Sequence, residues 1–131
     1  MKAKEYISEK LTPEQFAAAM DALPLALERV NGTDFFTAVY GFGCNLHSDL
    51  LFVPMRLLPN QLTRFLEDSI SQHIFQPGDN DLHISVSEGR LTLTFCHEGD
   101  IHIGGNDRLL AEQIQSVCPF ATFRWKQEGG V

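Results

Sequence analysis

The segment from residue 81 to residue 103 constrains the fold more than any other, because its apolar residues alternate strictly with polar ones. Six apolar residues share one face of the two strands that this pattern predicts: Leu82, Ile84, Val86, Leu91, Leu93 and Phe95. A period of two is typical of β-strands with one buried face. A two-residue turn, Glu88-Gly89, with glycine at a position of positive φ, joins the strands into a β-hairpin.

One register of this hairpin satisfies every apolar pair. Counting from the turn, it pairs Val86 with Leu91, Ile84 with Leu93 and Leu82 with Phe95. A slip of one residue would move the whole apolar set to the opposite face. We therefore predict this register, with one apolar and one polar face.

A third strand is predicted directly after the hairpin. We expect a three-residue loop, Glu98-Gly99-Asp100, because it keeps the apolar residues in phase and pairs Cys96 with His102. A two-residue loop would instead place Ile101 opposite Cys96. His97 then falls in phase with the buried residues. The outer face of the three strands gathers four polar side chains: Asp81, His83, Cys96 and His102.

The clearest helix start lies near the N-terminus. Thr12 is a suitable N-cap, Pro13 fits the first helical position, and Gln15 completes a capping box. Apolar residues at helical spacing follow. Pro24 is expected to break or kink this helix, because proline lacks a backbone N–H and crowds the preceding turn.

Two further helices and three further strands are predicted. Apolar stripes at helical spacing follow Asn60, and follow Asn106 or Asp107, which are suitable N-caps. His73 lies on the stripe of the earlier of these two helices. Strand-forming residues predominate in three segments: 33–42, 49–55 and 120–125. Pro54 places the end of the second segment at a sheet edge or a bulge.

These elements together predict an α+β fold. We expect a mostly antiparallel sheet of about five or six strands with roughly three helices packed on one face. A length of 131 residues favours a single domain, residues 1–131. The polar ends, residues 1–10 and 127–131, are expected to be loose.

The charge of the chain excludes some classes of partner. The formal net charge is −7, whereas binding to nucleic acid or to an anionic membrane requires concentrated lysine and arginine. No apolar run has the length of a membrane span, and no signal peptide follows Met1. Cys44, Cys96 and Cys118 are an odd number of cysteines, which favours reduced thiols and a cytoplasmic protein. Gly41-Phe42-Gly43 lacks the rest of a phosphate-binding or dinucleotide motif, so no cofactor is predicted.

Two kinds of chemistry are conceivable on the outer face of the hairpin. One is a metal site, since zinc accepts thiolate, imidazole and carboxylate ligands. The candidate ligands are Cys96, His102, His83, Cys44 and His47, with Asp81 beside them. The other is nucleophilic catalysis by Cys96, with His102 as base and Asp81 as orienting acid. Neither set has the close spacing of an established motif, so partly covered side chains on a polar sheet face are the simpler interpretation.

Acidic residues also concentrate in the loops around the hairpin. Five carboxylates are the candidate partner-binding residues: Asp79, Asp81, Glu98, Asp100 and Asp107. Such residues form a negative rim that attracts a cationic partner. Turns favour aspartate and glycine for conformational reasons as well.

The leading hypothesis is a small acidic module that binds another protein and occludes a basic site on it. In general character, though not in any motif, the chain resembles bacterial toxin-neutralising (immunity) proteins and secretion chaperones. The alternative is a metal-dependent or cysteine enzyme centred on Cys96, His102, His83 and Asp81. A third interpretation is a homo-oligomer that pairs exposed strand edges such as residues 120–125.

Overall fold

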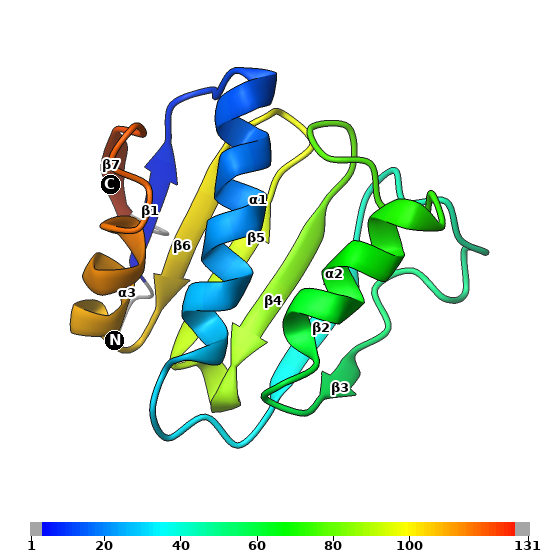
Figure 1. The fold of residues 1–131 in the computed structure, drawn as a ribbon, viewed down its shortest axis with the longest axis horizontal. Coiled ribbons are helices and arrows are strands. Elements are labelled where there is room, and N and C mark those ends of the chain that lie inside the picture. Colours follow the sequence, from blue (N-terminus) through cyan, green and yellow to red (C-terminus); the bar gives the residue numbers. More distant parts are fainter. Residues whose placement is uncertain (1–3, 128–131) are drawn as a thin grey trace.

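The computed structural model describes residues 4–127, which form three α-helices and one seven-stranded antiparallel sheet (Figure 1). The strands are β1 (Lys4–Ser8), β2 (Phe36–Tyr40), β3 (Met55–Leu57), β4 (Leu82–Val86), β5 (Leu91–Phe95), β6 (Ile101–Gly105) and β7 (Phe123–Gln127). The helices are α1 (Pro13–Glu28), α2 (Leu62–Ser71) and α3 (Arg108–Gln115). The predicted α+β class is confirmed, and the sheet has more strands than expected.

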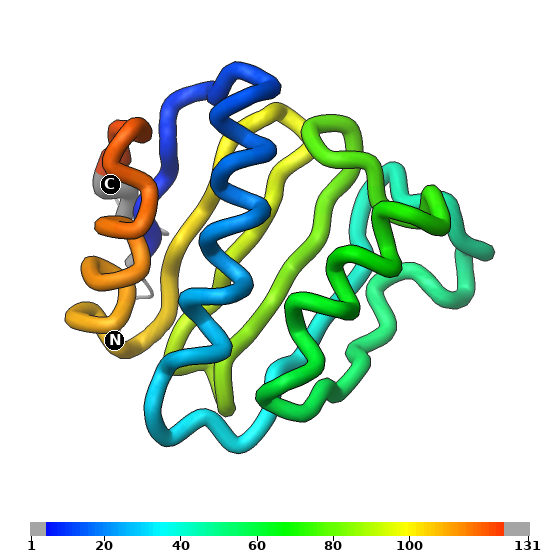
Figure 2. The backbone as a smooth tube through the Cα atoms, in the orientation of Figure 1, coloured from blue at the N-terminus to red at the C-terminus, as the bar shows by residue number. Residues whose placement is uncertain are grey.

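The order of the strands across the sheet is β3-β2-β4-β5-β6-β1-β7. The first strand therefore lies between β6 and β7, and the two ends of the described chain are neighbours (Figure 2). The prediction that residues 1–10 are loose is wrong for residues 4–8, because β1 is hydrogen-bonded to a strand on each side. Of the predicted tail, Gln127 belongs to β7, and residues 128–131 lie outside the described range.

The helices lie over one face of the sheet (Figure 1). The strand residues that face them are buried, whereas the alternate residues of β2, β4 and β5 are partly exposed on the other face. This alternation produces one hydrophobic core between the sheet and the helices. Among the described residues no element covers the second face of the sheet. This uncovered face carries mainly hydroxyl and imidazole side chains: Thr37, Val39, His83, Ser85, Thr92, Thr94 and His102.

The central hairpin, β4 with β5, is confirmed pair by pair, from Val86 opposite Leu91 to Leu82 opposite Phe95. Both residues of the predicted turn have positive φ, 53° at Glu88 and 85° at Gly89. These are the dihedral signs that a type I′ turn requires.

The predicted register of the third strand is wrong by two residues. The structure places Thr94 opposite His102 and Phe95 opposite Ile101. The loop does have three residues, but it comprises residues 97–99, and the N–H of Cys96 donates to the carbonyl of Asp100 at 3.0 Å. The reason is Gly99, whose φ is 83°. In a three-residue hairpin loop the third residue adopts the left-handed conformation, and Gly99 is third in the loop 97–99 but second in the predicted loop 98–100.

Helix α1 begins as predicted and continues past its proline. The capping box of Thr12 and Gln15 is present, with Pro13 at the start. The expected break at Pro24 is wrong, because the helix runs on to Glu28. Pro24 lies on the buried side of the helix, between the buried residues Leu23 and Leu27. Packing of this apolar face against the sheet outweighs the local cost of proline.

Other local predictions need correction. Of the predicted strand 49–55, residues 49–54 form a loop and Met55 begins β3, at the sheet edge. Phe52 in this loop has a φ of 63°, which is not extended backbone. Asn60 does not cap α2, whose N-cap position is Gln61. His73 lies beyond the end of α2 and is exposed. Asp107 caps α3 through the N–H of Leu110, as one of the two alternatives predicted.

Candidate functional site

Four of the five predicted partner-binding carboxylates lie at one end of the sheet. Asp79 and Asp81 precede β4, while Glu98 and Asp100 lie in and next to the turn between β5 and β6. Asp107 lies beyond the far end of β6, a distance on the order of 17 Å for five residues at about 3.3 Å each. There it accepts from the N–H of Leu110 and pairs with Arg90 at 3.2 Å. These two contacts hold the pKa of Asp107 below its ordinary value, the Leu110 N–H being the larger cause.

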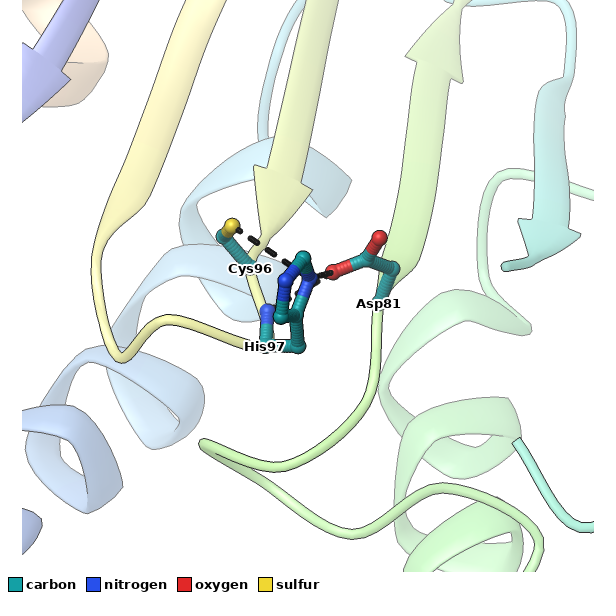
Figure 3. A group of neighbouring side chains, drawn as sticks. All are labelled: Asp81, Cys96 and His97. Carbon is teal, nitrogen blue, oxygen red and sulfur yellow. Dashed lines mark hydrogen bonds and ion pairs between the residues drawn. The ribbon is translucent and has the colours of Figure 1, made fainter. Parts of the chain in front are cut away.

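Asp81, Cys96 and His97 form the first cluster at this end (Figure 3). One carboxylate oxygen of Asp81 accepts from the backbone N–H of His97 at 2.7 Å and from its Nδ1 at 2.8 Å. This pairing raises the pKa of His97 above its ordinary value. His97, expected in phase with the buried residues and near the turn, is a turn residue whose side chain is 38% exposed. Its ring lies against that of Phe42, with 5.0 Å between the centroids.

A second cluster shares Cys96 and adds Asp100 and His102. His102 is on β6, on the uncovered face of the sheet, and its Nδ1 hydrogen-bonds the carboxylate of Glu5 on β1. Its Nε2 faces Asp100 Oδ2 at 3.4 Å. Cys96 and His102 are therefore close, as expected, although they are not opposite each other in the ladder.

Burial and nearby carboxylates make Cys96 a poor nucleophile. The pKa of its thiol is raised to about 12, by burial above all and to a smaller extent by Asp100 and Asp81. Catalytic cysteines depend on the opposite environment, in which a cation or a helix N-terminus stabilises the thiolate. The raised pKa of Cys96 does not favour the interpretation of Cys96, His102 and Asp81 as a catalytic triad.

We expect all three thiols of the metal-free native protein to react slowly with iodoacetamide at neutral pH. Burial raises the pKa of Cys44, of Cys96 to about 12 and of Cys118 to about 11, so thiolate is scarce at each site. Mass spectrometry of alkylated peptides measures the three rates, with the unfolded chain as the control for full reactivity. Selective, rapid alkylation of Cys96 would contradict this assignment.

The remaining predicted ligands do not join the second cluster. His83 Nδ1 lies 3.0 Å from the hydroxyl of Thr94, and burial lowers the pKa of His83. The Sγ of Cys44 donates to the backbone carbonyl of Asp81, whereas His47 is exposed and pairs with Asp49. The combined site of Cys44, His47, Cys96 and His102 is therefore not formed.

A groove that the sequence did not indicate opens on the helix side of the same end. It has a volume of about 720 Å³ and lies between the start of α1, the loop after α2 and the β5–β6 turn. These three segments meet at one end of the sheet in Figure 1. Its lining is mainly apolar, with a charged rim: Leu11, Pro13, Phe16, Ala17, Met20, Ile70 and Pro77, then Lys10, Asp21, Asp79, His97 and Glu98.

Comparisons with protein-family models, with curated proteins and with solved structures found no match to this chain. Within residues 4–127, none of the helices has the length and apolar character that a membrane span requires.

Proposed function

We propose that this protein is a non-enzymatic binding module that holds a basic, partly apolar segment of another protein in the groove beside α1. The supporting observation is the groove itself, in which an apolar lining is bordered by three exposed carboxylates and one lysine. Apolar area supplies affinity, and charge on the rim steers association and selects the partner.

The carboxylates of Asp21, Asp79 and Glu98 are the ones that a partner can reach, because all three are exposed and line the groove. Asp81 is occupied by His97, and the side chain of Asp100 is only 16% exposed. We therefore assign the rim to Asp79 and Glu98 among the predicted residues and add Asp21. Asp107 has a structural role at the start of α3.

One exposed aromatic residue next to the groove, Phe42, extends the proposed surface. Phe42, which is 62% exposed, contacts His97 of the groove lining. The loop between β2 and β3 exposes Leu50, Phe52 and Val53 as well. Large apolar side chains that are exposed to this extent in one loop are compatible with a protein–protein contact site.

The finer proposal is an immunity-type inhibitor in the cytoplasm, which covers a basic site on a toxin or a similar protein. A net charge of −7 complements such a site. All three cysteines are free, which suits a reducing compartment. The high pKa of Cys96, about 12, supports a binder over a cysteine enzyme.

Charge reversal on the rim tests the proposal. The double variant Asp79→Lys/Glu98→Lys should lose the natural partner in affinity capture from a lysate of the source cells, because the rim no longer attracts a cation. With the captured partner purified, stopped-flow kinetics should give an association rate that is lower by roughly tenfold or more at low salt. The difference should shrink as salt screens the charges.

The matched control is Asp34→Lys/Glu88→Lys. Both residues are exposed and lie at the opposite end of β4, where the N–H of Asp34 bonds Ser87. This variant has the same net charge as the rim variant and should retain the partner. If no protein is captured in a way that depends on Asp79 and Glu98, or if both variants slow association equally, the proposed site is wrong.

A further inference from the structure

We propose that Cys96, Asp100 and His102 bind a divalent transition-metal ion of the zinc type. Their ligand atoms lie within 4.8 Å of one another and come from both sides of the β5–β6 turn. Thiolate, carboxylate and imidazole are the ligand types that zinc accepts. This inference does not depend on the groove or on its proposed partner.

Two buried polar atoms in this cluster have no hydrogen-bond partner: Asp100 Oδ1 and His102 Nε2. The separation between His102 Nε2 and Asp100 Oδ2 is 3.4 Å, longer than the usual range of about 2.7–2.9 Å for a charge-assisted hydrogen bond. Buried polar atoms are almost always paired, so an unpaired set requires an explanation. A bound cation would satisfy both atoms at once.

Glu5 prepares His102 to act as a ligand. Its carboxylate accepts the hydrogen bond from His102 Nδ1, which leaves the lone pair of Nε2 directed at Asp100 and Cys96. A carboxylate behind a histidine in this manner fixes its tautomer and raises its basicity as a metal ligand. Glu5 is thus a positioning residue, contributed by the strand that neighbours β6.

The neighbouring cluster of Asp81, Cys96 and His97 lacks these features. One oxygen of Asp81 already accepts from both the backbone and the ring of His97. Because an ionised carboxylate only accepts, the Nδ1 of His97 that faces Asp81 and Cys96 acts as a donor and offers no lone pair to an ion. None of the buried side-chain atoms without a hydrogen-bond partner in the described residues belongs to this cluster. We therefore assign the ion to the second cluster.

The charges and the coordination number are also consistent with a dication. The Cys96 thiol loses its proton when it coordinates, and its charge and that of Asp100 are then balanced by the ion. Three protein ligands leave one position of a tetrahedral ion for water or another ligand. Because the ion would join the two sides of the β5–β6 turn, it would stiffen the turn that contributes His97, Glu98 and Gly99 to the groove.

Cobalt(II) is a suitable probe, because thiolate coordination gives it a strong charge-transfer absorption. We expect the wild-type protein to bind one Co²⁺ per chain with this absorption, and Zn²⁺ to displace it. X-ray absorption of the zinc-loaded protein should report one sulfur at about 2.3 Å with nitrogen or oxygen ligands at about 2.0–2.2 Å. This measurement needs no variant, so it is valid even if substitutions impair folding.

Variants then identify the ligands. Cys96→Ser should abolish the charge-transfer band, His102→Gln and Asp100→Asn should weaken binding strongly, and Glu5→Gln should weaken it by about 10–100-fold. The matched controls His97→Gln and Cys44→Ser should bind Co²⁺ as the wild type does. Absence of the band in the wild type, zinc without a sulfur ligand, or a band that survives in Cys96→Ser would overturn the proposal.

Discussion

Phe95→Ala is expected to lower the free energy of unfolding by about 3–5 kcal/mol, the range for loss of a buried phenylalanine ring. Phe95 is completely buried in the middle of the core. Its ring packs edge-on against Phe16 of α1, with 5.9 Å between the ring centroids, and at a tilt against Phe75, after α2, with 6.4 Å between the centroids. The substitution therefore removes contacts that join both helical regions to the sheet. Urea denaturation followed by circular dichroism measures the effect.

Phe42→Ala is the matched control for this prediction, since the same atoms are removed from a ring that is 62% exposed. Within the described part of the chain its ring contacts one other ring, that of His97. We expect a loss of about 1 kcal/mol or less. Equal losses for the two variants would show that the core does not depend on Phe95 as described.

Gly105→Ala is expected to destabilise the fold by at least about 3 kcal/mol. A Cβ on residue 105 would lie 2.4 Å from the carbonyl oxygen of Arg90 and 2.7 Å from the Cα of Leu91. Both are backbone atoms, so no side-chain rotation relieves the clash. The φ of Gly105 is 122°, which an alanine rarely adopts. Thermal and urea unfolding of the purified variant provide the measurement.

Gly78→Ala separates the steric clash of the added Cβ from the cost of the positive φ. Gly78 also has a positive φ, 84°, but nothing lies within 4 Å of its added Cβ. This variant should lose only about 1–2 kcal/mol, the cost of the backbone conformation alone. A loss at residue 105 no larger than at residue 78 would mean that the approach of Arg90 is not a constraint.

The strongest local pattern in the sequence predicted its part of the fold correctly. In the β4–β5 hairpin, alternation and the Glu88-Gly89 turn impose the same register, so two independent signals agree. In the β5–β6 turn the pattern alone allowed registers that differ by two residues, because such a shift keeps every side chain on its face. The conformation that Gly99 adopts decides between them.

The candidate site was only partly predictable, because the period of two fixes the face on which a side chain lies but not the residue opposite it. The nearness of Cys96 and His102 was expected, because a shift by two residues leaves both on the polar side. The role of Glu5 was missed, since its strand pairs with β6 across nearly the whole sequence. The groove beside α1 was missed as well: it depends on how a helix packs against two loops, for which residue periodicity carries no signal.

The position of β1 between β6 and β7 determines when this strand can pair during synthesis of the chain. Ile7 pairs with His102, so β1 can join the sheet only after residues near 105 have left the ribosome. Contacts of such long sequence separation are costly in chain entropy and form late. Until β1 pairs with it, β6 has an open edge, and His102 on that strand lacks its partner Glu5. The pairing of Glu5 with His102 is therefore a late event of biosynthesis, and the pairing of β7 with β1 has still to follow it.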